Sequence, residues 1–233
     1  MMTYKTIGLI GGMGPLATVD LFQKIVQMTR AEKDQEHIPI LIDNNTNISD
    51  STDYLLGKGS SPLDELIFSA SRLQKLGADF LIIACNTAHY FYADISSVIK
   101  IPIVNMIEET AKEALYSGYK KVGLLGTEGF MSCVNYMSYY NDVGIELVLP
   151  SKAEQDIITA LIYKAIKAQN DDFDISAFLL LLEKLSKEGA EAFVLSCTEL
   201  PIAFSKYRIA YPSIDPTTVL ARKAIITAGG EIK

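Results

Sequence analysis

Short runs of aliphatic and β-branched residues alternate with longer segments of helical periodicity along the whole chain. The runs that predict strands are 6–10, 39–43, 80–84, 103–105, 122–125, 146–149 and 192–196. The runs at 80–84 and 192–196 are apolar without the alternation of a half-exposed strand, so helices should cover both faces of their sheets. Strands that alternate with helices pair in parallel through helical crossovers, which predicts an α/β protein.

The sequence contains an internal repeat. The segment KTIGLIGG at 5–12 reappears as KKVGLLGT at 120–127, and LQKLGADFLIIAC at 73–85 reappears as LSKEGAEAFVLSC at 185–197. Internal self-similarity indicates a duplicated structural unit. We therefore expect two pseudosymmetric lobes, each a mostly parallel sheet flanked by helices, with the active site in the cleft between them.

Cys85 and Cys197 occupy equivalent positions, each at the end of a repeated strand. Ligands of parallel sheets bind beyond the carboxyl ends of the strands, so lobes that face each other would bring both thiols to one cleft. The ordinary role of an unpaired cysteine is core packing, and two cysteines at symmetric strand ends favour chemistry instead. Asn86 and Thr198 follow the thiols and are able to cap a helix, whose free N–H groups would bind a carboxylate and lower the pKa of the thiol.

Two thiols on opposite faces of one carbon suit a reaction that removes a proton from one face and adds a proton to the other. Stereochemical inversion is such a reaction: one sulfur acts as thiolate and the other as thiol, and the roles reverse for the opposite enantiomer. Reactive separations of about 3–3.5 Å on each face would put the sulfurs about 6–7 Å apart. That is well beyond the ~2.05 Å of a disulfide bond.

Composition narrows the class of protein. The chain has 233 residues, of which 49% are hydrophobic and 21% charged, which is typical of a globular protein. Its net charge is −7 and its basic residues do not cluster, so we expect neither a nucleic-acid nor a membrane partner. The apolar stretches at 80–85 and 178–182 are shorter than the roughly 18 residues of a membrane span, and the N-terminus does not resemble a signal peptide. We expect a cytoplasmic protein without a structural disulfide or a metal site, because its 3 cysteines and 2 histidines are not grouped.

Three motifs give the chain a family resemblance: GLIGGMGPLAT at 8–18, ACNTAH at 84–89 and SCTELP at 196–201. They resemble the aspartate/glutamate racemase family, most nearly its aspartate racemase branch, and the resemblance extends over essentially the whole chain. It implies a homodimeric racemase of a small amino acid that uses no pyridoxal phosphate, other cofactor or metal. It also implies that the lobes exchange ends, with residues 1–105 and 212–233 in the first lobe and 106–211 in the second.

By position, the resemblance makes Cys85 and Cys197 the two acid/base residues. The substrate-binding positions that it implies are Met13, Ser51, Thr52, Asn86, Thr87, Ala88, Thr127, Lys167 and Thr198. The segment 86–88 would hold the α-carboxylate, and Lys167 matches a lysine aimed at a carboxylate. One position departs from the family, because Ser51 stands where an arginine usually clamps the side-chain carboxylate. Serine cannot form that bidentate pair, so either Lys167 and other donors substitute or the substrate differs from aspartate.

The resulting hypothesis is a racemase that interconverts L- and D-aspartate or a closely related acidic amino acid. Two alternatives remain: a related isomerase or decarboxylase of a small dicarboxylate, and a non-catalytic amino-acid-binding protein. The pattern G-x-G-x-x-A at 12–17 also fits a dinucleotide site, although that interpretation does not explain the duplicated cysteine strand.

Three further residues could take part in the reaction: two lie close in sequence to the repeated cysteines, and one is the third cysteine of the chain. His89, four residues after Cys85, is either a partner of the thiol or an outward-facing residue. Glu199 either tunes Cys197 or caps the helix that follows. Cys133 has no counterpart in the repeat, and we expect it to serve packing.

Overall fold

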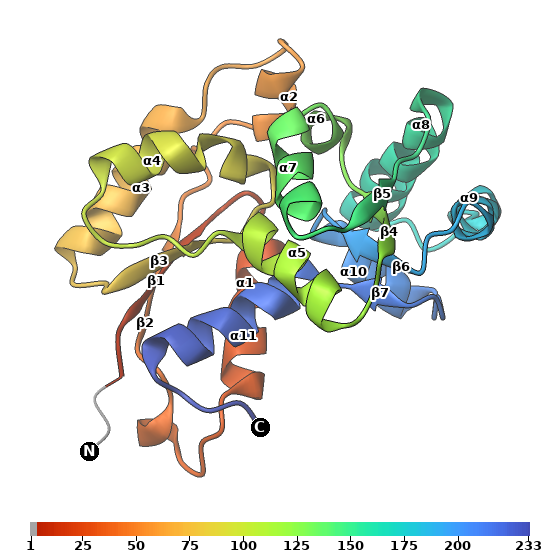
Figure 1. Cartoon of the computed structure of the whole chain (residues 1–233). Helices are drawn as coiled ribbons and strands as arrows, with labels where there is room; N and C mark the ends of the chain where they lie inside the picture. Colours follow the sequence, from red (N-terminus) through yellow and green to blue (C-terminus); the bar gives the residue numbers. More distant parts are fainter. Residues whose placement is uncertain (1–3) are drawn as a thin grey trace. The chain divides into compact units, whose positions relative to one another are not determined.

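The computed structural model describes residues 4–233, apart from the side chain of residue 134. The chain divides into two compact units, Met1–Glu109 with Thr217–Lys233, and Thr110–Pro216 (Figure 1). Helix α5 (Met106–Tyr116) leads from the first unit into the second, and α11 (Pro216–Ala228) returns the chain to the first.

The first unit contains a parallel sheet with the strand order β2-β1-β3. Its strands are β1 (Ile7–Gly11), β2 (Ile40–Asn44) and β3 (Phe80–Ile83). Its other elements are α1 (Pro15–Met28), η1 (Asp34–Glu36), α2 (Ser51–Leu55), α3 (Leu63–Lys75), η2 (Thr87–Phe91) and α4 (Tyr92–Val98), together with α11. In register, Ile7 pairs with Ile40 on one side and with Phe80 on the other.

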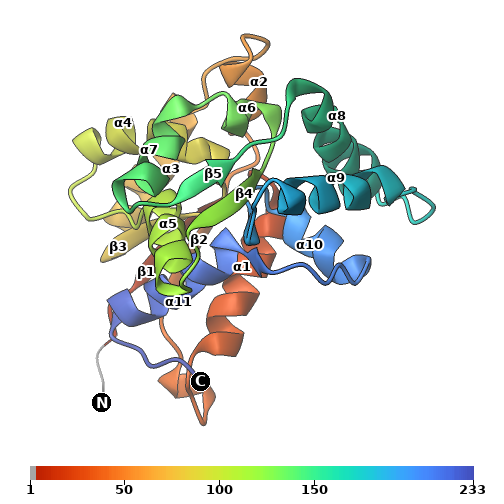
Figure 2. The same cartoon turned by 45° about the vertical axis from the view of Figure 1, so that its right-hand side comes forward.

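Helices cover both faces of this first sheet (Figure 2). Leu9 and Ile82 belong to an apolar cluster with residues of α1 and α11. Ile10 and Leu81 belong to a second cluster with residues of α3 and α4. Because successive side chains of a strand point to opposite faces, a continuous apolar run is what a sheet covered on both faces requires.

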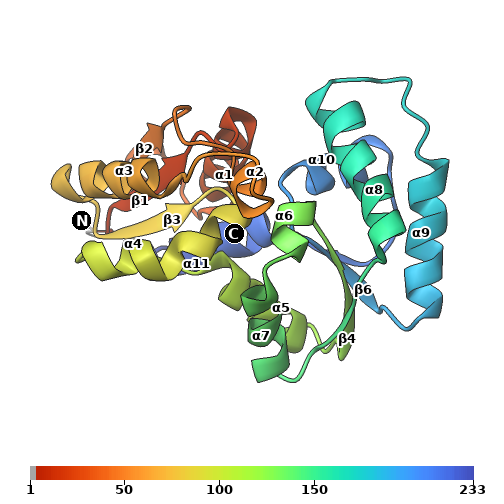
Figure 3. The ribbon, with the colours of Figure 1, turned by 90° about the horizontal axis from the view of Figure 1, so that it is seen from above.

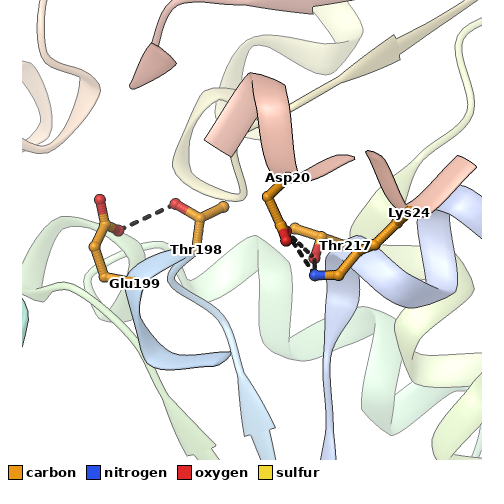
Figure 4. A network of polar contacts seen from close by, with 5 residues as sticks. All are labelled: Asp20, Lys24, Thr198, Glu199 and Thr217. Atoms are coloured by element: carbon orange, nitrogen blue, oxygen red, sulfur yellow. Dashed lines mark hydrogen bonds and ion pairs between the residues drawn. The ribbon is translucent and has the colours of Figure 1, made fainter. Parts of the chain in front are cut away.

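A polar network ties the two helices of one face together in the first unit. On α1, the carboxylate of Asp20 accepts a hydrogen bond from Lys24 at 2.6 Å. Both residues also contact the Thr217 hydroxyl at the start of α11, and Thr217 lies 3.3 Å from the Asp20 carboxylate (Figure 4). This network fixes the returning C-terminal helix to the first helix of the chain.

The second unit contains a parallel sheet with the order β5-β4-β6-β7. Its strands are β4 (Lys121–Leu125), β5 (Glu146–Val148), β6 (Ala192–Leu195) and β7 (Ser213–Ile214). Its helices are α6 (Glu128–Met131), α7 (Val134–Asp142), α8 (Lys152–Ala160), the π-helical η3 (Leu161–Lys167), α9 (Ser176–Lys187) and α10 (Glu199–Lys206). Figure 3 shows α8, α9 and α10 on one side of β4 and β6, and α7 on the other. The predicted α/β class, with parallel sheets flanked by helices, is confirmed.

The two sheets repeat each other in their backbone hydrogen bonds. The N–H of Ala84, directly after β3, donates to the carbonyl of Ile10 on β1 at 2.9 Å. The N–H of Ser196, directly after β6, donates to the carbonyl of Leu125 on β4 at 2.7 Å. The residue that follows each of these is a cysteine. Both repeated cysteines therefore leave their sheets at the same place.

The run 103–105, predicted as a strand, forms less structure than expected. Only Ile103 pairs, in an isolated parallel bridge with Leu81, and helix α5 begins at Met106. The N–H of Leu81 donates to the carbonyl of Pro102 at 2.8 Å. The N–H of Val104 donates to the carbonyl of Leu81 at 2.9 Å, and the start of α5 at Met106 ends the run before a second pair can form.

The counterpart of this run in the second unit does form a strand, which the sequence analysis did not predict. Ser213–Ile214 is β7 and pairs in parallel with Phe193 and Val194 of β6. The N–H of Phe193 donates to the carbonyl of Pro212 at 2.9 Å. With so short a run between two prolines, apolar periodicity gives no signal for a strand.

Candidate active site

The first candidate thiol lies in a tight turn at the end of β3. Cys85 is half-buried, and the residues after it are buried and lead into the 3-10 helix η2. Helix α2 packs on this turn, with the rings of Tyr54 and Phe91 5.5 Å apart. The first unit therefore brings Cys85 together with Asn86, Thr87 and Ala88, as their adjacency in sequence requires.

Asn86 does not cap the following helix, contrary to the prediction from its residue type. It is itself in helical conformation, and its side chain makes no capping hydrogen bond. Its amide nitrogen Nδ2 is buried and has no hydrogen-bond partner among the described residues. Leaving a buried donor unpaired costs about 1–3 kcal/mol, so this amide is available to an oxygen atom of a ligand.

His89 is neither a partner of the Cys85 sulfur nor an outward-facing residue. It is buried, its Nδ1 lies 2.8 Å from the carbonyl oxygen of Cys85, and its Nε2 accepts a hydrogen bond from the N–H of Met106 at 3.1 Å. Since Nε2 accepts, Nδ1 carries the proton and donates it to the carbonyl. Burial lowers the pKa of His89 to about 4, so the ring is neutral at pH 7. The histidine fixes the backbone at Cys85.

The second candidate thiol lies at the equivalent place after β6. Cys197 is buried, and its Sγ donates a hydrogen bond to Oε2 of Glu199 at 3.0 Å. The hydroxyl of Thr198 donates to the same carboxylate oxygen at 3.0 Å (Figure 4). Burial, and then the charge of Glu199, raise the pKa of the Cys197 thiol well above its ordinary value. The thiol form is therefore the favoured one.

Neither residue after the second cysteine caps the helix as expected. Thr198 is in helical conformation and makes no capping bond to the backbone of α10, because its hydroxyl contacts Glu199 instead. Of the two roles weighed for Glu199, the contact with Cys197 is the one that the structure contains.

Lys167 lies at the end of η3 and faces the same carboxylate. Its Nζ is 3.9 Å from Oε1 of Glu199 and 4.5 Å from the centre of the Tyr163 ring. Its side chain as a whole is 39% exposed. The second unit thus gathers Cys197, Thr198 and Lys167 around Glu199, which the predicted set of site residues did not include.

Thr127 follows β4, the strand next to β6. Its hydroxyl accepts a hydrogen bond from the N–H of Phe130 at 3.2 Å and so caps α6. Next to it, the amide of Gln155 donates to the carbonyl of Gly126 at 2.7 Å. Gln155 lies on another helix, α8, and belongs to no motif, so no pattern in the sequence points to this contact.

The remaining predicted positions belong to the first unit. Met13 is half-buried and packs against the cluster that contains Ile10. Ser51 is the first residue of α2; it is buried, and its hydroxyl has no partner among the described residues. The N–H of Thr52 donates to the Asp50 carboxylate at 2.7 Å, so Asp50 caps this helix. Cys133, expected to serve packing, is buried, and its sulfur donates to the carbonyl of Gly129 at 3.3 Å.

A family model named Asp/Glu/Hydantoin racemase matches residues 10–224 of the chain. The chain belongs to this family. The resemblance inferred from the cysteine and glycine motifs is therefore confirmed, and so is the predicted class of enzyme, a racemase and hence an isomerase.

Solved structures and curated relatives agree with the family. The chain is similar to an aspartate racemase from Picrophilus torridus, with 32% identity, a TM-score of 0.86, and coverage of 98% of this chain and 96% of that one. It is similar to an aspartate racemase homologue from Pyrococcus horikoshii, with 27% identity, a TM-score of 0.79, and coverage of 97% and 99%. It is also 26% identical over 231 residues to RacX, a broad-specificity amino-acid racemase of Bacillus subtilis, which covers 95% of this chain and 97% of that protein.

The length and apolar character of the helices in the described part of the chain bear on whether any of them spans a membrane. No helix within residues 4–233 has both the length and the apolar character needed to cross a bilayer.

Proposed function

We propose that the protein racemises aspartate, or a closely related acidic amino acid, without a cofactor, by proton transfer at Cys85 and Cys197. The observation that carries this proposal is the equivalence of the two thiols, each two residues beyond the end of its strand and directly after a residue that is bonded in the same way to the neighbouring strand. Membership of a racemase family and likeness to aspartate racemases support it.

In the proposed reaction, one sulfur is a thiolate and takes the α-proton, while the other is a thiol and gives a proton to the opposite face. The electron pair of the broken C–H bond is held by the carbanion and is returned to the proton from the second sulfur. The mechanism requires both sulfurs to reach the same α-carbon. The high pKa of Cys197 supports the thiol role for that residue.

The substrate's carboxylates need donors, and the proposal assigns two. The unpartnered amide Nδ2 of Asn86, in the turn after Cys85, is suited to an oxygen of the α-carboxylate. The side chain of Lys167 is suited to the other carboxylate, because it is exposed and carries a positive charge. The proposed substrate-binding set is completed by Met13, Thr52, Thr87, Ala88, Thr127 and Thr198.

A second candidate is a racemase that accepts other side chains. Ser51 provides a small neutral hydroxyl at the position where the family resemblance leads one to expect an arginine. RacX, to which the chain is similar, is named for broad specificity. On this reading the proton transfer is the same and the side-chain preference is wider.

We also infer a homodimer in the cytoplasm, with lobes of residues 1–105 with 212–233 and 106–211. The two compact units have boundaries near these residues, which supports the division. A reducing compartment keeps the two proposed catalytic sulfurs from being oxidised to a disulfide. Analytical ultracentrifugation tests the dimer, and a single species with the mass of one chain would contradict it.

The experiment that tests the function is exchange of the α-proton in deuterated water, followed by NMR, with reductant and without added cofactor. L-aspartate, L-glutamate and the neutral L-alanine are compared, and chiral chromatography of the products identifies the D-enantiomers. We expect exchange with aspartate, formation of D-aspartate, and loss of both in Cys85→Ser and Cys197→Ser. Exchange with neutral amino acids at a similar rate would favour the broader racemase. The absence of exchange with every amino acid would overturn both.

A further inference from the structure

The carboxylate of Glu199 gathers donors around the second cysteine. Oε2 accepts hydrogen bonds from Sγ of Cys197 and from the Thr198 hydroxyl, each at 3.0 Å, and Oε1 lies 3.9 Å from Nζ of Lys167. The Glu199 side chain is only 17% exposed. A partly buried carboxylate in this position orients the S–H bond of Cys197, because the thiol has one proton and donates it to Oε2 of Glu199.

The first cysteine has a different residue at the corresponding position. The repeat aligns Cys85 with Cys197, and counting two residues on from each gives Thr87 and Glu199. A neutral hydroxyl therefore stands where the second unit has a carboxylate. The duplication retains the position of the sulfur and changes the charge beside it.

We propose that Glu199 is a positioning residue that orients the S–H bond of Cys197 and keeps this sulfur as the proton donor of the resting enzyme. Cys85 is then the sulfur that starts turnover as the base. The roles of the two sulfurs in turnover rest on the proposed racemase function. The pairing of Cys197 with Glu199 does not, because it is measurable without substrate.

The charged groups that act on Cys197 come from two elements. Glu199 on α10 raises the pKa of the thiol, in addition to burial, and Lys167 on η3, which packs on α10, acts in the opposite direction. Strand β6 (Ala192–Leu195) contributes no titratable side chain. When Cys197 gives up its proton, the electron pair of the S–H bond stays on sulfur beside the Glu199 carboxylate. Lys167 offsets part of the repulsion between these two negative charges.

This device makes the two halves of the reaction unequal. In the resting form, the Cys85 thiolate removes the α-proton and Cys197 protonates the opposite face. The product leaves the enzyme with the thiolate on Cys197, beside a like charge, and exchange of protons with water restores the resting form. Since the two enantiomers have the same free energy, kcat/KM is equal in both directions, and the inequality appears in kcat and KM separately.

The test is an ultraviolet titration of the thiolate in the Cys85→Ser protein, in which Cys197 and Cys133 remain. Adding Glu199→Gln removes the charge beside Cys197. We expect Cys197 to ionise at a lower pH, by about 1 pH unit or more. The matched control adds Glu183→Gln, which removes the same charge from an exposed ion pair on α9 of the same unit, and it should leave the titration unchanged. An unchanged or upward titration with Glu199→Gln overturns the inference.

A second variant tests the same arrangement independently, in case Glu199→Gln does not fold. Lys167→Met, added to Cys85→Ser, removes an exposed cation and should raise the pH at which Cys197 ionises. A lower pH for this variant would contradict the proposed arrangement. In the otherwise wild-type protein, Glu199→Gln should move the alkaline limb of the kcat/KM profile to lower pH. If no amino acid is racemised, the proposed function fails, whereas the titrations still decide the pairing of Cys197 with Glu199.

Discussion

The turns after Cys85 and Cys197 begin at the same place in their sheets and are built from different chemistry. After Cys85, the buried neutral ring of His89 holds the backbone and the thiol is half-exposed. After Cys197, the side chain of Glu199 holds the buried thiol itself. In the repeat, Pro201 occupies the position of His89 and so brings no side-chain hydrogen bond. Duplication of the backbone has thus placed two sulfurs equivalently, while the side chains beside them differ, with the Glu199 carboxylate on the Cys197 thiol and the His89 ring on the backbone at Cys85.

The largest effect is expected from removal of either sulfur. Cys85→Ser and Cys197→Ser should each lower racemisation by about 10²-fold or more, because an alcohol is a poor acid and base at neutral pH. Circular dichroism of the amino acid measures the rate. Cys133→Ala serves as the matched control and should retain activity, since this buried sulfur interacts with Gly129, Ser132 and Tyr136 and has no proposed role in the reaction. Racemisation at the wild-type rate by either serine variant would refute a catalytic role for the replaced sulfur and, with it, the two-thiol mechanism.

Asn86 should matter for binding more than for stability. Its amide Nδ2 lacks a partner in the folded protein, so Asn86→Ala removes an unpaired buried donor and should change the free energy of unfolding little. If the amide binds the substrate's carboxylate, KM should rise about 10-fold to 100-fold, as expected for a hydrogen bond to a charged group. Steady-state kinetics and urea denaturation separate the two effects. Asn141→Ala, on the exposed side of α7, is the control, and an unchanged KM for Asn86→Ala would remove this residue from the site.

His89 should make the protein less stable in mild acid. Its pKa is lowered by burial to about 4 from an ordinary value of 6.5, so the unfolded chain binds a proton more tightly than the folded one. The stability from this group is present above pH 6.5 and is lost as the pH falls toward 4. Between pH 7 and pH 5 the loss is about 2 kcal/mol.

Urea denaturation at the two pH values measures this loss. His89→Gln cannot take up a proton, so its free energy of unfolding should change less between pH 7 and pH 5 than that of the wild type. The variant should also be less stable at pH 7, because the carbonyl of Cys85 and the N–H of Met106 lose their geometry. His37→Gln, at a half-exposed histidine, is the control. Equal pH dependence of wild type and His89→Gln would argue against a buried neutral ring.

Sequence reasoning predicts the features that depend on backbone period and repetition. The runs ending at Cys85 and Cys197 become strands because apolar residues fill both faces of each sheet. The helices before them end at Gly77 and Gly189, which adopt φ values of 97° and 103° that favour glycine. The apolar strands and the helix-ending glycines depend on local sequence, and both occur twice because the chain contains a repeat, so they can be predicted from the sequence.

The side-chain contacts are less accessible to sequence reasoning, because they join elements that the pattern does not relate. Asn86 and Thr198 have the right residue type for helix caps, yet both adopt helical conformation and neither caps its helix. The position of Glu199 two residues after Cys197 was visible, but its contact with sulfur depends on the rotamer. The approach of Lys167 depends on how η3 packs on α10. Motif spacing contains no information on either.

The smallest effect is expected at Thr127, which separates a structural cap from a substrate contact at the second turn. Its hydroxyl accepts the N–H of Phe130 at the start of α6, so Thr127→Ala should lower the free energy of unfolding by about 1 kcal/mol. Thr127→Ser retains the hydroxyl and should restore most of that stability, which urea denaturation measures. If Thr127 also binds substrate, Thr127→Ala raises KM while Thr127→Ser does not. A stability loss without any change in KM would assign this residue to the helix cap alone, and the contrast with Asn86, which caps nothing, would then be complete.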